Sequence, residues 1–155
     1  MKRSKYLADR VREVFLDGKW IANTNYKEEL SSLNWQQAIC RVDNLNTIAS
    51  LTFHINYYLE GILYFLNEGE FLISDQFSFD LSEINSEKDW QEIVHSLLNN
   101  AELFAGKIES IEDSAWDDIF VNEKYGTYLR NIEGLIEHSY YHLGQIVLIQ
   151  KIIPK

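Results

Sequence analysis

Four long stretches of the chain repeat their apolar residues at the spacing of an α-helix. Their bounds are about 4–16, 45–67, 86–108 and 127–153. At about 100° per residue, one side of the second stretch carries Leu51, Ile55, Tyr58, Ile62 and Phe65. The only proline is Pro154, so no interior segment is forced to kink. The pattern predicts an all-α protein, organised as a four-helix bundle with long connecting loops.

The segment between the first and second long predicted helices is polar and includes a residue that can cap a helix. Residues 20–32 lack any apolar period and are predicted to form a loop. Asn34 is well suited to cap a short helix at about residues 35–40. The sequence therefore predicts a loop followed by one short helix between the first two long helices.

The connection after the second predicted helix is long for a bundle. Residues 68–85 are rich in Phe, Ser and Asp, which makes this linker a candidate crossover or a loop that covers a site. Ser86 with Asp89 resembles a capping box, with Asp in place of the usual Glu or Gln, and opens the third helix. Short strands within the linker or within residues 112–126 are an alternative that the pattern leaves open.

Composition and charge narrow the classes of function. Residues 1–155 fit a single domain, and the net charge of -10 argues against nucleic acid as a partner, because binding to phosphates needs a basic surface. No run approaches the roughly 20 apolar residues that cross a bilayer, and no Lys/Arg cluster suggests a membrane surface. With one cysteine, Cys40, and no apolar secretory core near the N-terminus, we expect a soluble cytoplasmic protein.

The histidines are the candidate functional residues. His138 and His142 stand four residues apart in the last predicted helix, so both imidazoles leave the same face about one turn apart. His54 lies at the edge of the apolar side of the second predicted helix and can supply a third ligand. Three neutral imidazoles suit a divalent transition metal such as Zn, Ni, Cu or Fe. His95 has no partner at useful spacing and is predicted to lie at the surface.

A different reading of the three histidines is purely structural. Partly buried histidines are often satisfied by hydrogen bonds to the backbone or to Tyr hydroxyls.

The zinc-protease pattern His-Glu-x-x-His is absent, since Ser139 follows His138 and the acid, Glu137, precedes it. Cys40 is interpreted as a buried apolar side chain rather than a nucleophile, and core packing is the default role of the four tryptophans.

Two segments together resemble the DinB/YfiT-like superfamily. They are Leu45-Asn-Thr-Ile-Ala-Ser-Leu-Thr-Phe-His-Ile-Asn-Tyr-Tyr-Leu59 and Glu137-His-Ser-Tyr-Tyr-His-Leu-Gly-Gln-Ile146. Within it, the chain is most similar to small uncharacterised bacterial members. The resemblance implies a four-helix bundle in which His54, His138 and His142 hold a divalent metal, with Gly144-Gln145-Ile146 matching the residues that often follow the last ligand. It also implies a homodimer.

The resemblance suggests a metal-dependent hydrolase or a thiol-dependent transferase that activates water or a low-molecular-weight thiol for a small-molecule substrate. Tyr57, Tyr141 and Gln145 lie within a turn of the ligands and are candidates to orient substrate or water, whereas Tyr58 is assigned to the core. The alternative is a non-enzymatic dimeric bundle that binds metal or another ligand as a sensor, scavenger or interaction module. A bundle without any metal is the third possibility.

Overall fold

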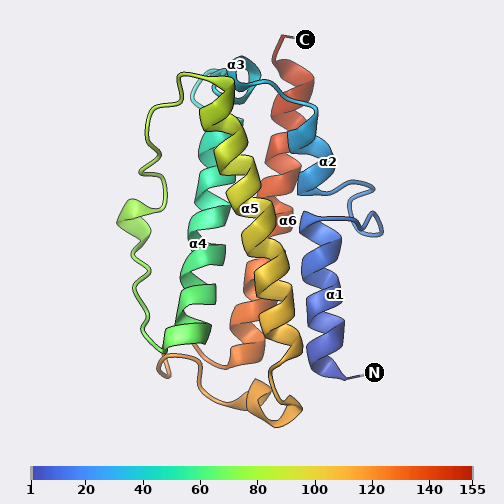
Figure 1. The fold of residues 1–155 in the computed structure, drawn as a ribbon, viewed down its shortest axis with the longest axis vertical. Coiled ribbons are helices and arrows are strands. Elements are labelled where there is room, and N and C mark those ends of the chain that lie inside the picture. The colour runs from blue at the N-terminus through green and yellow to red at the C-terminus, as the bar shows by residue number, and fades with distance from the viewer. Residues whose placement is uncertain (1, 155) are drawn as a thin grey trace.

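The computed structural model of the protein describes residues 2–154, and within them it is all-helical, with no strand (Figure 1). The α-helices are α1 (Arg3–Phe15), α2 (Tyr26–Ser31), α3 (Trp35–Ala38), α4 (Ile48–Glu68), α5 (Glu87–Glu109) and α6 (Tyr128–Ile152). Two short 3-10 helices are η1 (Asp75–Phe77) and η2 (Asp113–Asp117). The predicted all-α class is confirmed. Where strands were an alternative, the described residues hold only one isolated bridge, between Ile119 and Thr127.

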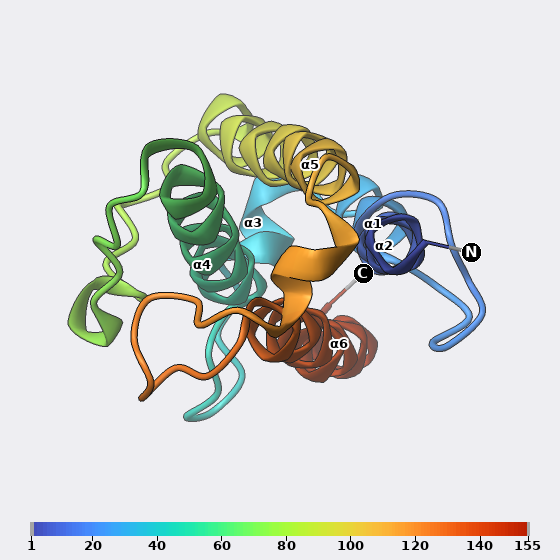
Figure 2. The ribbon, with the colours of Figure 1, turned by 90° about the horizontal axis from the view of Figure 1, so that it is seen from below.

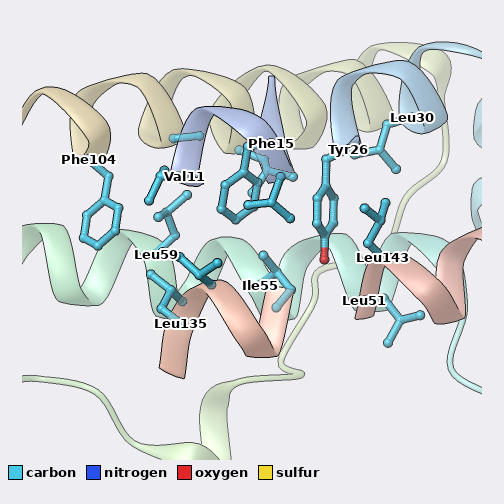
Figure 3. Packing of buried hydrophobic residues seen from close by; sticks show 14 of the residues in the cluster. Val11, Phe15, Tyr26, Leu30, Leu51, Ile55, Leu59, Phe104, Leu135 and Leu143 are labelled. Atoms are coloured by element: carbon cyan, nitrogen blue, oxygen red, sulfur yellow. The ribbon is translucent and has the colours of Figure 1, made fainter. Parts of the chain in front are cut away.

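The four long helices lie around a shared interior. Seen from one end, α1 lies beside α5 and α6, and α4 also lies beside α5 and α6 (Figure 2). Side chains from different helices meet between them, among them Val11, Phe15, Leu59, Phe104 and Leu135, all at most 4% exposed (Figure 3). Burial of these apolar surfaces is the main force that holds the helices together. Among residues 2–154, no helix combines the length and apolar character needed to cross a membrane.

Helix α2 was not predicted, because residues 20–32 were expected to form a loop. Asn25 caps it, with its side-chain oxygen accepting a hydrogen bond from the Glu28 amide at 2.9 Å. Tyr26 and Leu30, one turn apart, are both fully buried, and the Tyr26 ring stacks on Phe15 with centroids 5.0 Å apart. Six residues are too few for an apolar period to stand out in the sequence. Contacts with α1 and α6 stabilise this helix.

Residues 70–85, called here the strap, connect α4 to α5. They run back along the outer side of α4, so α4 and α5 point the same way, as a crossover requires (Figure 1). The Tyr57 hydroxyl donates to the Ser74 carbonyl at 3.0 Å and accepts from the Ser74 amide at 2.9 Å. The Tyr58 hydroxyl donates to Asp75 Oδ1 at 2.8 Å. These bonds hold the strap against α4.

The strap approaches α4 closely at Gly61. A Cβ atom at this position would lie 2.5 Å from Ile73 Cγ1, whereas one at Gly106 on α5 would meet nothing within 4 Å. We expect Gly106→Ala to raise the free energy of unfolding by up to about 1 kcal/mol, since alanine favours helix. Gly61→Ala should gain less or lose stability, because Ile73 must move. Urea unfolding measures both, and equal gains would show that the strap does not pack tightly on α4.

Candidate metal centre

Helices α4 and α6 bring the three predicted histidines to one place. Thr127 caps α6 through a hydrogen bond from the Arg130 amide, and α6 then carries His138 and His142 one turn apart. Thr47 caps α4 through a bond from the Ser50 amide, and His54 lies two turns further along. The three histidines form a group whose ligand atoms all lie within 4.8 Å of one another.

The facing atoms are the Nε2 nitrogens. His138 Nε2 lies 2.8 Å from His142 Nε2 and 3.3 Å from His54 Nε2. Two nitrogens bound to one tetrahedral ion at about 2.0–2.1 Å would be about 3.3 Å apart. The pair His54 and His138 already has this separation, the pair His138 and His142 is closer, and all three ligand atoms lie within 4.8 Å of one another. Movement of the rings would let the three nitrogens share one transition-metal ion.

The opposite nitrogens of two rings face oxygen acceptors. His54 Nδ1 lies 3.1 Å from the Ser78 carbonyl oxygen, and His142 Nδ1 lies 2.6 Å from Gln145 Oε1. Because an oxygen of this kind can only accept, each Nδ1 carries the proton and donates it. Each Nε2 then presents a lone pair toward the group's centre, which is the tautomer that a metal ligand needs.

Burial keeps the rings neutral. Desolvation, followed by the charges of His142 and His54, lowers the pKa of His138 to about 4. Burial is also the main cause that lowers the pKa of His54 and of His142 from its ordinary value. Since protonated imidazole cannot bind a metal, neutral rings at pH 7 are ready to accept one without first releasing protons.

Aromatic rings surround the trio. Phe79, from the strap, stacks on His54 with centroids 4.0 Å apart and planes 13° from parallel. Tyr58 meets His54 edge-on at 5.0 Å and His138 at 5.5 Å. Tyr141 meets His142 edge-on at 4.9 Å, although its own side chain is 64% exposed. These rings limit the orientations open to the ligands and reduce their contact with water.

A hollow of about 350 Å³ between α4 and α6 reaches one member of the trio, His138. Its lining includes His138 itself, and the other lining residues are Tyr58, Ile62, Tyr125, Arg130, Asn131, Gly134 and Leu135. A volume of this size admits a small molecule next to a metal ligand. The hollow thus offers a small ligand space beside one of the three candidate metal-binding side chains.

The other candidates from the sequence have mixed outcomes. Gln145 contacts a ligand, Tyr141 flanks one, and Tyr57 is bonded to Ser74 of the strap instead. Tyr58, assigned to the core, is only half-buried and lies beside the histidines, because its hydroxyl reaches the strap.

The remaining predictions concern residues away from the trio. His95 is exposed, as predicted, and Glu137 is exposed and lies 3.5 Å from Arg130. Cys40 was interpreted as buried but is half-buried, since it lies in the connection between α3 and α4. Trp90 and Trp116 are fully buried as core residues, whereas Trp20 is 90% exposed.

The sequence did not indicate Ser78 and Phe79 as part of the site. Ser78 acts through its backbone carbonyl, which any residue possesses, and Phe79 lies in a segment without periodicity. The one available signal was the unusual length of the linker, which suggested a loop that covers a site.

The fold and the trio define an all-helical protein with a three-histidine cluster of metal-binding geometry. Comparison with protein-family models, curated proteins and solved structures finds no match to any of them. The function of this protein is therefore inferred from its own residues and their geometry.

Gln145 offers a test of how the ligands are held. We expect Gln145→Leu to lower zinc affinity by about 10- to 100-fold, because His142 loses the acceptor that holds its Nδ1 proton. Gln145→Glu keeps an acceptor oxygen and should retain binding. The matched control is Gln150→Leu on the same helix. The side-chain amide of Gln150 donates to the Glu29 carbonyl at 3.0 Å instead of contacting a histidine. Competition with a chromophoric chelator measures the affinities, and equal values for the two leucine variants would contradict the assigned role.

Proposed function

We propose that the protein binds one divalent transition-metal ion through His54, His138 and His142 and uses it as a metal-dependent enzyme. The observation that carries the proposal is the convergence of three Nε2 atoms while two of the Nδ1 atoms face oxygen acceptors. Three neutral ligands leave the ion its full charge and an open position, which is the arrangement of catalytic rather than structural sites.

A bound ion of this kind supplies Lewis acidity, which lowers the pKa of a water or a low-molecular-weight thiol and makes it a nucleophile near neutral pH. The chain's own residues orient the rings through Ser78 and Gln145 and limit water through Phe79 and Tyr58. The hollow beside His138 accommodates a small substrate. The reaction we propose is hydrolysis or group transfer, with the nucleophile supplied from solution.

We further propose that the protein is a DinB/YfiT-like four-helix bundle. Support comes from the ring of α1, α5, α4 and α6 and from the long crossover between α4 and α5. One candidate ligand lies on the second long helix and two lie on the last, followed by Gly144-Gln145-Ile146. Gln145 beside His142 gives this short motif a physical role.

The experiment begins with protein purified without a metal-affinity tag and stripped of metal. Titration with Zn²⁺, Co²⁺, Ni²⁺ and Fe²⁺ should give close to one ion per chain. Bound Co²⁺ should absorb visible light more intensely than the hydrated ion, because its coordination number is lower. Loaded protein is then mixed with thiols and electrophiles, and with activated esters. Turnover that disappears in His54→Ala supports an enzyme. A chain that takes up none of these ions would refute the proposal.

A non-enzymatic role is the second candidate, favoured by apolar side chains left in solvent. Trp20 is 90% exposed and Ile21 is 58% exposed in the connection between α1 and α2. Such side chains often contact a partner, and a second copy of the chain is the partner we propose. Light scattering after size exclusion should give twice the chain mass. Metal binding without turnover over a broad substrate panel would favour a sensor or scavenger.

A further inference from the structure

A second hollow lies on the other side of the trio, along the same contact between α4 and α6. Its volume is about 250 Å³. It is lined by Asn44, Leu45, Asn46, Leu51, Gln145, Leu148 and Ile149. Leu51 and Ile149 are at most 3% exposed, whereas Leu45 is 43% and Leu148 is 56% exposed. Buried and exposed apolar side chains thus surround a space that is open to solvent.

None of the seven lining residues carries a charge, although the chain as a whole has a net charge of -10. The hollow beside His138 differs, because it includes Arg130. A charged ligand group placed in the second hollow would lose hydration without gaining an opposite charge. An alkyl or aryl group would instead remove apolar surface from water, both its own and that of the leucines. Four of the seven lining residues are apolar, and the other three, Asn44, Asn46 and Gln145, are neutral amides, so the lining favours an uncharged group whose surface is mainly apolar.

Gln145 links this hollow to the trio. Its side chain is part of the lining and also contacts His142 Nδ1 at 2.6 Å. Ile149 follows His142 by about two turns of α6 and lies about 20° from it around the helix, whereas Leu148 lies about 120° away, beyond Gln145. At 1.5 Å of rise per residue, this places them roughly 9–10 Å along the helix from His142. One small molecule can span that distance.

We infer that the second hollow binds the unreactive apolar part of the molecule whose polar group is held at the metal. The inference rests on the proposed metal-dependent function and narrows its substrate class. The substrate is a small amphiphile, with a metal-binding head and a short alkyl or aryl tail. The tail contributes affinity by burial against Leu45, Leu51, Leu148 and Ile149.

The test uses the Co²⁺-loaded or Zn²⁺-loaded full chain and straight-chain hydroxamates from acetohydroxamate to octanohydroxamate. The hydroxamate group anchors each probe to the metal, and only the tail changes along the series. Once the tail reaches Gln145, affinity should rise about two- to fourfold for each added methylene, the gain expected from partial to full burial of a CH₂ group. Changes in the cobalt spectrum and calorimetry with the zinc form measure the dissociation constants.

A pair of matched variants, followed by a third, tests whether the probe's tail lies in the second hollow. Leu148→Glu places a charge at the rim of the hollow, and Leu103→Glu makes the same change on α5, where Leu103 is 54% exposed and lines neither hollow. The quantity compared is the ratio of octanohydroxamate affinity to acetohydroxamate affinity. We expect this ratio to fall at least tenfold in Leu148→Glu and to stay at the wild-type value in Leu103→Glu. Leu148→Trp, which fills the space without adding charge, should end the gain at a shorter tail.

The outcomes separate the two proposals. If no ion binds, the proposed function and this inference are both overturned. If the ion and acetohydroxamate bind but affinity does not depend on tail length, only the inference fails, and the hollow does not receive the substrate. A rise with tail length that Leu148→Glu leaves intact would also overturn it, because the tail would then lie elsewhere.

Discussion

Replacing His142 with alanine is expected to lower zinc affinity by more than about 100-fold. Loss of a group that merely orients a metal ligand typically costs 10- to 100-fold, so loss of a ligand itself should exceed that range. His142 Nε2 lies 2.8 Å from His138 Nε2. Among residues 2–154, the group of side chains that could hold a metal consists of the three histidines alone, so no fourth side chain can replace His142. Competition against a chromophoric chelator, started from metal-free protein, measures the affinity of wild type and variant.

His95→Ala provides the control for this prediction. His95 is exposed on α5 and is the one histidine outside the trio, so its loss should leave the affinity at the wild-type value. Circular dichroism checks that both variants keep their helices. Equal zinc affinity in His142→Ala and wild type would mean that the ion, if any, binds elsewhere.

Replacing Trp90 with alanine is expected to lower the free energy of unfolding by about 3–5 kcal/mol, the usual cost of deleting a large buried aromatic side chain. Trp90 lies near the start of α5 and is fully buried. Its indole Nε1 donates to the Leu33 carbonyl at 3.1 Å, which ties α5 to the connection between α2 and α3. The variant therefore leaves both a cavity and an acceptor without its donor. Urea unfolding followed by circular dichroism measures the loss.

Trp20→Ala makes the same chemical change where the side chain is 90% exposed. Measured at a chain concentration low enough to keep the protein monomeric, this variant should change stability by no more than about 0.5 kcal/mol, as is usual for surface substitutions. The comparison separates burial from residue type. Similar losses in the two variants would contradict the packing of Trp90 seen in the structure.

The long helices show how much of the fold the sequence predicted. Each of the four predicted helices overlaps an observed one, and the capping residues Asn34 and Ser86 act as predicted. Asp89, expected to complete a capping box, instead accepts from the Asn85 amide at 2.9 Å. Local signals succeeded because a long amphipathic period and a cap are properties of neighbouring residues.

In the candidate metal centre, too, some features follow from local sequence and others only from the tertiary structure. The His138 and His142 spacing requires only helical geometry, so the sequence indicated that both rings share a face. The sequence could not specify that Phe79 stacks on His54 or that the Ser78 carbonyl holds its Nδ1. Both depend on the path of the strap, which has no period of its own and is positioned by Tyr57, Tyr58 and Gly61 of α4.

The sequence by itself therefore determined the four long helices, their buried sides and the three candidate ligands, because periodicity and residue chemistry are properties of neighbouring residues in the chain. Only the tertiary structure decided that α2 forms, that Tyr58 joins the surroundings of the histidines, and that two hollows flank the trio. These features arise from contacts between residues far apart in sequence. Their stability comes from shared burial, which no single segment contains.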